Sequence, residues 1–251
     1  MLTKNKIKYI TSLAKKKFRD EEGVFLAEGA KVVGDILPYF RCQMLCGTKE
    51  FLTQNPQIKA DEIIEISEAE LLKCSQLKTP RDVIAVFYQP HNEPLKAEVA
   101  NEELCLMLDG VQDPGNLGTI IRLADWFGIS DIVCSADCAD CFNPKVIQAT
   151  MGAIIRVRVH YTDLAKWLAK QQQAGTPIYG TFLDGENIYS KKLTHNGIIV
   201  MGNEGQGIGA ACAATVSERL YIPPYPTDNN GSESLNVAIA TAIICSEFRR
   251  R

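Results

Sequence analysis

Histidine is scarce in this chain of 251 residues, which has three, His91, His160 and His195. None of them lies near a candidate nucleophile, so the sequence disfavours a hydrolase built on a serine–histidine pair. Long apolar runs are also missing, because the longest, residues 237–245, is well short of the roughly 20 residues of a membrane-spanning helix. The opening residues lack the apolar stretch of a secretory signal peptide. We therefore expect a cytoplasmic protein without a membrane partner.

Signals for disulfides and for metal binding are weak. The chain has nine cysteines, an odd number, and without a secretory signal we interpret them as reduced thiols. Cys138 and Cys141 have the C-x-x-C spacing of zinc ligands, and Cys134 is close by. A second pair at matching spacing is missing, so free thiols are the favoured interpretation over zinc, and we expect no metal.

Acidic residues are absent from residues 1–19, which hold seven lysines and arginines. The other residues carry 20 basic and 30 acidic groups, so the formal net charge of −3 averages a basic N-terminus with an acidic body. Residues 4–19 place apolar side chains at helical spacing, with lysines around the rest. Such a helix is either a solvated face or a surface for an anionic partner.

The order of apolar segments predicts an α/β protein with two domains. Residues 1–93 combine short strands and helices in a small α/β unit, and residues 94–103 are the predicted linker. In residues 104–251, short apolar strands are separated by helices, which predicts a parallel sheet covered on both faces. Its expected strands include residues 104–108, 131–134, 155–159, 178–182 and 198–201.

Three segments of the second domain have residues suited to chemistry. In the first, the turn at residues 109–116 opens a helix whose free N–H groups and Arg122 suit a phosphate or ribose. The alternative is that Asn116 caps the helix and that Arg122 pairs with a surface carboxylate.

The second segment, residues 198–209, has four glycines after an apolar strand, so the backbone either passes close to a ligand or turns tightly. Its spacing matches neither the dinucleotide nor the triphosphate motif. Glu204 would repel a phosphate, so ribose hydroxyls or a cationic ligand fit better. In the third segment, Ser234 is a candidate helix cap, whereas Asn236 would be a poor helix residue without a further role.

Together these segments resemble a known family. They contain Asn116-x-Gly-x-x-x-Arg122-x-Ala, Gly202-Asn-Glu-Gly205, and Ile222-Pro followed by Ser234-Leu-Asn-Val-Ala. The three motifs in this order are similar to those of the SpoU/TrmH RNA 2′-O-methyltransferases of the SPOUT class. Residues 23–29 also resemble the start of the ribosomal-protein-like substrate-binding domain that many members carry.

The resemblance implies a C-terminal parallel-sheet SPOUT domain with a deep trefoil knot, preceded by a small α/β RNA-binding domain. It further implies S-adenosylmethionine as the cofactor, a homodimer formed through the SPOUT domain, and methylation of a ribose 2′-hydroxyl. The implied catalytic residues are Arg122, contributed across the dimer, with Asn116, Glu204, Ser234 and Asn236. The implied cofactor-binding residues are Gly202, Asn203, Gly205, Ile222 and Leu235.

With an RNA substrate implied, contact with the RNA backbone becomes the favoured role of the basic N-terminus. Because a guanidinium is effectively always protonated, we expect Arg122 to clamp a phosphate and the developing oxyanion. The 2′-hydroxyl proton would then pass to solvent or to Glu204. Large-subunit ribosomal RNA is the favoured substrate; the alternatives are tRNA and a catalytically idle RNA-binding or ribosome-assembly factor. The RNA-binding residues expected are Lys4, Lys6, Lys15, Lys16, Lys17 and Arg19.

Overall fold

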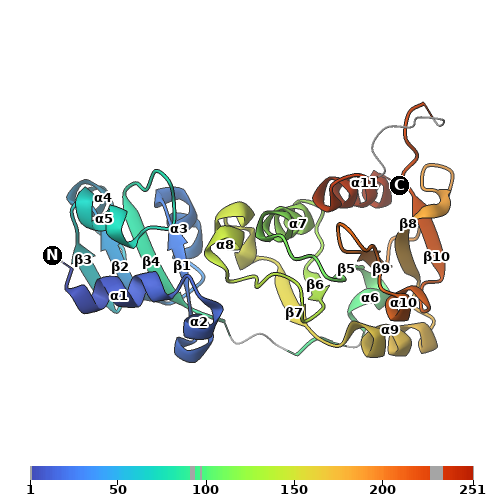
Figure 1. Cartoon of the computed structure of the whole chain (residues 1–251), viewed down its shortest axis with the longest axis horizontal. Coiled ribbons are helices and arrows are strands. Elements are labelled where there is room, and N and C mark those ends of the chain that lie inside the picture. Colours follow the sequence, from blue (N-terminus) through green and yellow to red (C-terminus); the bar gives the residue numbers. More distant parts are fainter. Residues whose placement is uncertain (1, 91–93, 97, 227–233, 251) are drawn as a thin grey trace. The chain divides into compact units, whose positions relative to one another are not determined.

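The computed structural model describes residues 2–90, 94–96, 98–226 and 234–250. Contacts divide the chain into two compact units (Figure 1). The N-terminal unit comprises Met1–His91 together with Asp140–Ile155, and the C-terminal unit comprises Asn92–Ala139 with Arg156–Arg251. Residues 140–155 thus pack with the first unit, although the sequence assigns them to the second domain.

The N-terminal unit is built on a mixed four-stranded sheet in the order β1-β4-β2-β3. β4 pairs antiparallel with β1 and β2, whereas β2 and β3 are parallel. The strands are β1 (Val24–Glu28), β2 (Cys42–Gly47), β3 (Glu62–Glu65) and β4 (Val83–Tyr88). The helices are α1 (Lys4–Ser12), α2 (Lys16–Glu22), α3 (Ala30–Ile36), α4 (Lys49–Gln54), α5 (Glu68–Cys74) and α8 (Pro144–Thr150), followed by a 3-10 turn, Ala153–Ile155.

The basic N-terminus forms two helices rather than one. Lys15 is extended between α1 and α2, with φ −97° and ψ 132°. The break lets Arg19 fold back, so that its guanidinium donates to the carbonyls of Leu13 (2.8 Å) and Ala14 (3.0 Å) at the end of α1. The same guanidinium forms an ion pair with Asp140, and Arg19 is only 1% exposed. The prediction that Arg19 binds RNA is therefore wrong: it is a buried structural residue.

Aromatic stacking joins residues 140–155 to the sheet of the N-terminal unit. The Phe142 ring stacks on Phe25 of β1 with 5.1 Å between centroids, and Phe25 stacks in turn on Phe87 of β4. With the Arg19–Asp140 pair, these contacts explain why this segment packs with the N-terminal unit.

The C-terminal unit contains a six-stranded sheet in the order β10-β8-β9-β5-β6-β7, in which every paired strand is parallel. This confirms the predicted parallel sheet. Helices α7 and α11 lie on one side of it, and α6, α9 and α10 pack on the other (Figure 1). The strands are β5 (Leu104–Leu108), β6 (Asp131–Cys134), β7 (Arg158–Tyr161), β8 (Ile178–Asn187), β9 (Gly197–Met201) and β10 (Glu218–Tyr221). The helices are α6 (Val99–Glu102), α7 (Pro114–Trp126), α9 (Leu164–Gln173), α10 (Ala210–Ala213) and α11 (Val237–Arg250).

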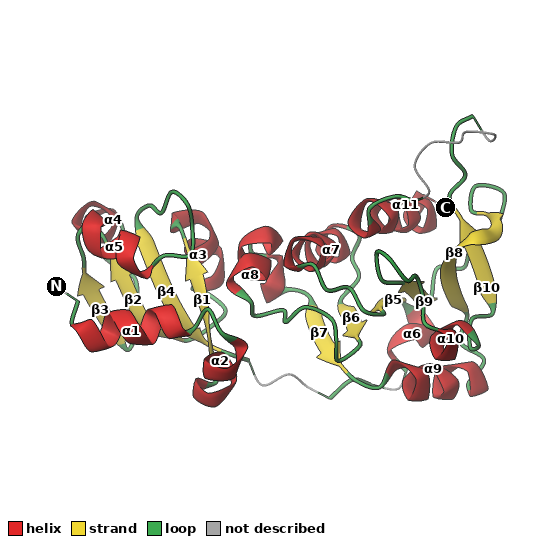
Figure 2. Cartoon of the chain, in the orientation of Figure 1, coloured by secondary structure: helices red, strands yellow, loops and turns green. Residues whose placement is uncertain are grey.

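Helices α7 and α11 lie side by side (Figure 2), and hydrogen bonds join them at both ends. At their amino ends, Asn236 Nδ2 donates to Asn116 Oδ1 (2.9 Å). At the carboxyl end of α7, the Arg249 guanidinium donates to the carbonyls of Phe127 (2.8 Å) and Gly128 (3.1 Å). A cation at this end of a helix also offsets its dipole. The two helices are thereby held parallel, with their amino ends together. No helix in the described ranges has the length and apolar character needed to cross a membrane.

Candidate active site

The site lies where parallel strands of the C-terminal unit end. In the register of β5 and β9, Leu108 pairs with Met201, so Asp109 and Gly202 begin neighbouring loops. Ile222 follows β10 at the same edge and is half-buried. Ligands of open α/β sheets bind outside the carboxyl ends of strands. This edge is therefore the candidate active site.

The glycine-rich loop after β9 closes tightly on itself. The backbone N–H groups of Asn203 and Gly207 each donate to the other's carbonyl at 2.9 Å. A Cβ on Gly202 would lie 2.2 Å from the carbonyl carbon of Gly207, closer than atoms can approach. Glycine is thus required at position 202 because the returning backbone occupies the space of a side chain.

Asn203 gives the loop its shape and ties it to the loop after β5. Its Oδ1 accepts from the N–H groups of Gly205 (2.9 Å) and Gln206 (3.0 Å). Its Nδ2 donates to the Gly110 carbonyl at 2.7 Å. The Asn203 side chain therefore holds the loop in shape, and the backbone N–H and carbonyl of Asn203 are engaged with Gly207 as well.

A second tie between these loops was missed by sequence reasoning. Asp109 Oδ2 accepts from the N–H of Gly209 at 2.8 Å. The sequence indication for Asp109 is its position, as a carboxylate directly after a buried strand. Because Asp109 and Gly209 are 100 positions apart, no local pattern indicates the pairing.

Three of the predicted catalytic residues form one chain of hydrogen bonds. Asn116 Nδ2 donates to Glu204 Oε1 at 2.8 Å, and Asn116 Oδ1 accepts from Asn236 Nδ2 at 2.9 Å. The three come from α7, from the glycine loop and from the start of α11. The first, second and third motifs thus meet at one place.

The caps of α7 and α11 differ from those considered for the sequence. Asp113 caps α7 by accepting from the N–H of Asn116 at 2.8 Å, with Pro114 at the first helical position. Asn236 Oδ1 accepts from the N–H of Ala238 (3.0 Å), so Asn236 caps α11 in place of Ser234. Asp113 leaves the Asn116 side chain free for the site, and Asn236 uses its oxygen for the helix and its nitrogen for Asn116.

Arg122 lies on the exposed face of α7. Within the described part of the chain, its guanidinium forms no hydrogen bond or ion pair. The surface pair that does form on this helix joins Asp125 to Arg156, with two hydrogen bonds of 2.7 and 2.8 Å. Ser234 and Leu235 are also exposed and directly precede Asn236.

The cysteine cluster braces the loop after β5. All nine cysteines are free thiols and buried. The Cys138 thiol donates to the Leu108 carbonyl and accepts from the N–H of Val111, both at 3.2 Å. Hydrogen bonding from Cys134 outweighs the effect of burial and lowers the pKa of Cys138 to about 7. Among the residues that the structure describes, no three His, Cys, Asp or Glu side chains are grouped to hold a metal ion.

Comparison with known proteins identifies both parts of the chain. Residues 103–246 match the model of the SpoU rRNA Methylase family, and residues 4–85 match the MRM3-like substrate binding domain. The 23S rRNA (guanosine(2553)-2′-O)-methyltransferase RlmP of Bacillus subtilis (strain 168) is 31% identical over 251 residues, which cover 97% of this chain and 96% of that protein.

Two solved structures match this chain over its full length. One, described as an RNA methyltransferase of the TrmH family from Porphyromonas gingivalis, is 44% identical with a TM-score of 0.88, and the match covers 100% of this chain and 99% of that one. The AdoMet-bound rRNA methyltransferase from Sinorhizobium meliloti is 29% identical with a TM-score of 0.84, covering 100% and 96%. The resemblance inferred from the three motifs is confirmed, and the chain belongs to the SpoU rRNA methylase family.

Proposed function

We propose that this chain transfers the methyl group of S-adenosylmethionine to a ribose 2′-hydroxyl of large-subunit ribosomal RNA. Family membership and the relative named for 2′-O-methylation of 23S rRNA support this activity. The observation that carries the proposal is the hydrogen-bond chain Glu204–Asn116–Asn236, which unites the three motifs at the carboxyl edge of the sheet. An RNA-binding factor without catalysis would not need this arrangement of polar side chains.

The residues at this edge fit the proposed cofactor. The glycine loop offers backbone groups, since the side chain of Asn203 is occupied by Gly110 and by the loop itself. Ile222, which directly follows β10, and Leu235, which precedes α11, add apolar side chains, and Ile222 is half-buried. Gly202, Asn203, Gly205, Ile222 and Leu235 are therefore the residues proposed to hold S-adenosylmethionine, which supplies an electrophilic methyl carbon when bound.

The trefoil knot of the family belongs to the same proposal. In the sheet, β8 separates β9 from β10, so the segment after β9 must cross β8 to reach β10. After β10, the chain returns to pack α11 against α7, the helix that joins β5 to β6. These two opposite crossings support a threaded connection, and its loops are the ones that carry the proposed cofactor residues.

Catalysis in this proposal depends chiefly on positioning, because the positive charge on the sulfonium disappears in the transition state. Asn236 holds Asn116, and Asn116 holds the Glu204 carboxylate in one orientation. We propose that this carboxylate, or solvent beside it, accepts the 2′-hydroxyl proton, while Ser234 orients the ribose. Arg122 would clamp the adjacent phosphate and the developing oxyanion through its planar guanidinium.

A homodimer would bring Arg122 to the site of the other subunit. Exposed apolar side chains on the two paired helices support this assembly: Trp126, one turn after Arg122 on α7, is 83% exposed, and Ile239 on α11 is 53% exposed. Large exposed apolar side chains on neighbouring helices are typical of a protein interface, and a two-fold axis would use the same surface twice.

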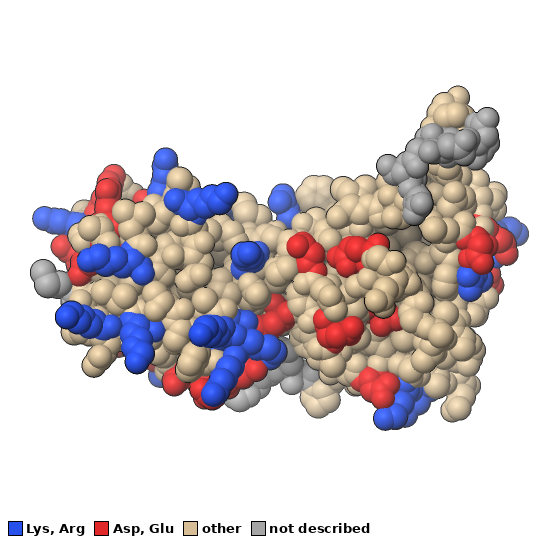
Figure 3. All heavy atoms as spheres, in the orientation of Figure 1, with Lys and Arg blue, Asp and Glu red and all other residues tan. Residues whose placement is uncertain are grey.

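Contact with RNA is proposed for the basic N-terminus without Arg19. On the face drawn in Figure 3, lysine and arginine side chains are more frequent over the N-terminal unit than over the C-terminal unit. Lys4 and Lys15 are exposed. Lys16 and Lys17 are exposed but pair with Asp20 and Glu21 within α2, and Lys6 pairs with Glu62. A ribosomal substrate and nine reduced, buried cysteines favour the cytoplasm.

Calorimetry with S-adenosylmethionine, followed by transfer of a labelled methyl group to RNA, tests the proposal. We expect cofactor binding, and methylation of large-subunit ribosomal RNA prepared from cells that lack the protein. Mapping by nuclease digestion and mass spectrometry then identifies the nucleotide. Absence of cofactor binding would refute the enzyme, methylation of tRNA alone would refute the substrate, and RNA binding without transfer would indicate an idle factor. Glu204→Gln should retain cofactor binding and lose transfer.

A further inference from the structure

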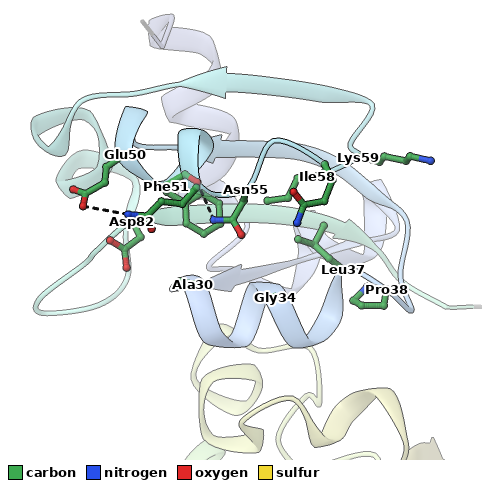
Figure 4. A pocket seen from close by; sticks show the side chains of 12 residues that line it. Ala30, Gly34, Leu37, Pro38, Glu50, Phe51, Asn55, Ile58, Lys59 and Asp82 are labelled. Atoms are coloured by element: carbon green, nitrogen blue, oxygen red, sulfur yellow. Dashed lines mark hydrogen bonds between the residues drawn. The ribbon is translucent and has the colours of Figure 1, made fainter.

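The N-terminal unit contains a groove that the proposed chemistry does not use. It has a volume of about 550 Å³ and runs along α3, between this helix and α4 with the loop that follows (Figure 4). Leu37, Phe51 and Ile58 supply apolar surface. In Figure 4, Glu50 and Asp82 lie at one end of the groove, and Lys59 at the other. All the residues that line it fall within the match to the substrate binding domain.

Small residues on α3 keep the groove open. Ala30 and Gly34 line it, and a Cβ built on Gly34 would meet no atom within 4 Å. Glycine is unfavourable in the interior of a helix, and close packing does not require it here. The space above Gly34 is therefore available to a ligand.

The polar groups of the groove are suited to a nucleobase rather than to phosphate. The Glu50 and Asp82 carboxylates would repel a phosphate but accept hydrogen bonds from the amino group of a base. Gln57 adds an amide group that both donates and accepts, and the Gln54 amide donates to Glu50 Oε1 (3.4 Å), which leaves Glu50 Oε2 for a base. Asn55 Nδ2 donates to the Phe51 carbonyl at 2.9 Å, which leaves Asn55 with a fixed acceptor oxygen.

One cationic side chain lines the groove, and two more adjoin lining residues in the sequence. Lys49 precedes Glu50, Arg81 precedes Asp82, and Lys59 lines the other end; all three are exposed. Carboxylates at one end of the groove and Lys59 at the other match a base whose amino group meets the carboxylates while its phosphate lies near Lys59. RNA is recognised in this manner where its bases are unpaired.

We infer that this groove binds an unpaired nucleobase with an exocyclic amino group, from the RNA that the enzyme methylates. The inference rests on the proposed function for the identity of the RNA. Glu50 and Asp82 would contact the edge of this base and so contribute to the choice of RNA. Neither residue belongs to the set proposed for methyl transfer.

Binding of short single-stranded oligonucleotides to the full chain, followed by fluorescence anisotropy, tests the inference. We expect cytidine oligomers to bind more tightly than uridine oligomers of equal length, because uracil lacks the amino group. Gly34→Leu should fill the groove and weaken binding of the cytidine oligomer by about tenfold or more. Thr53→Leu is the matched control, since Thr53 is an exposed residue of α4 that does not line the groove.

Glu50→Gln serves as a second variant that leaves the groove open. It should reduce the preference for cytidine over uridine, with circular dichroism and cofactor binding unchanged. Equal binding of the two oligomers by the unaltered chain would overturn the inference, and so would wild-type affinity of the Gly34→Leu variant. Binding of peptides but not of RNA in the groove would also overturn it. If the oligomers bind in a manner that depends on the groove but no methyl group is transferred, the result would instead count against the proposed function.

Discussion

Asp131 offers a quantitative test of the C-terminal unit. Its carboxylate accepts two hydrogen bonds from Arg158 (2.8 and 2.6 Å) and lies 2.9 Å from His160 Nε2, and its side chain is 7% exposed. Burial alone would raise its pKa. The hydrogen bonds and charges of His160 and Arg158 outweigh burial and lower the pKa of Asp131 from 3.8 to about 2.

This difference in pKa corresponds to about 2 kcal/mol of folding free energy. Because the pKa is lower in the folded state, the contribution is present above about pH 4 and is lost as the pH falls toward 2. Asp131→Asn should therefore lower the free energy of unfolding by about 2 kcal/mol near pH 7, with a smaller loss near pH 3.

Urea unfolding followed by tryptophan fluorescence measures this effect. Both tryptophans, Trp126 and Trp167, belong to the C-terminal unit, so the signal reports on the unit that contains Asp131. Asp125→Asn is the control, because Asp125 accepts the same two bonds from Arg156 at a more exposed position, where such a pair contributes less than about 1 kcal/mol. Equal losses for the two variants at pH 7, or a loss for Asp131→Asn that does not shrink toward pH 3, would refute the reasoning.

Three further predictions concern the active site. Arg122→Ala and Asn236→Ala should each inactivate the enzyme. When equal amounts of the two variants are refolded together, roughly a quarter of the activity should return, because half of the dimers then contain one intact site. No recovery would contradict an arginine supplied by the partner. Gly202→Ala should abolish cofactor binding in calorimetry, whereas Gly205→Ala, whose Cβ has no neighbour closer than 3.7 Å, should retain it. Similar affinities for these two variants would contradict the backbone closure at Gly202. Alkylation of Cys138 by a small thiol reagent, followed by mass spectrometry, should accelerate around pH 7, since its pKa is lowered to about 7. A midpoint near 9 would show that the Cys134 hydrogen bond is absent.

Much of the C-terminal unit was predictable because its signals are local. Apolar strands separated by helices indicate a parallel sheet, and this prediction is confirmed. The start of α7 also has a local signal, since Asp113 and Pro114 are a cap and a first helical residue. The residues preceding α11 were harder, because Ser234 and Asn236 are both good caps and the choice depended on which side chain could also reach α7.

Burial was not predictable for the N-terminus. Its composition indicated only a basic surface, but Arg19 is removed from that surface by carbonyls at the end of α1 and by a carboxylate 121 positions away. The same long-range pair joins residues 140–155 to the N-terminal unit, although the sequence places them among the strands and helices of the second domain.

The sequence by itself determined the family, the helices and strands at its three motifs, and the residue types that the chemistry needs. These depend on neighbouring residues and on recognisable spacing. Only the tertiary structure decided that Asn116 contacts Glu204 and Asn236, which are 88 and 120 positions away. It also decided that Asp109 fixes the glycine loop and that Gly34 leaves a groove open. The physical reason is that these hydrogen bonds and this groove form between segments that are distant in the sequence. Which segments meet follows from sheet order and packing rather than from any one stretch of sequence.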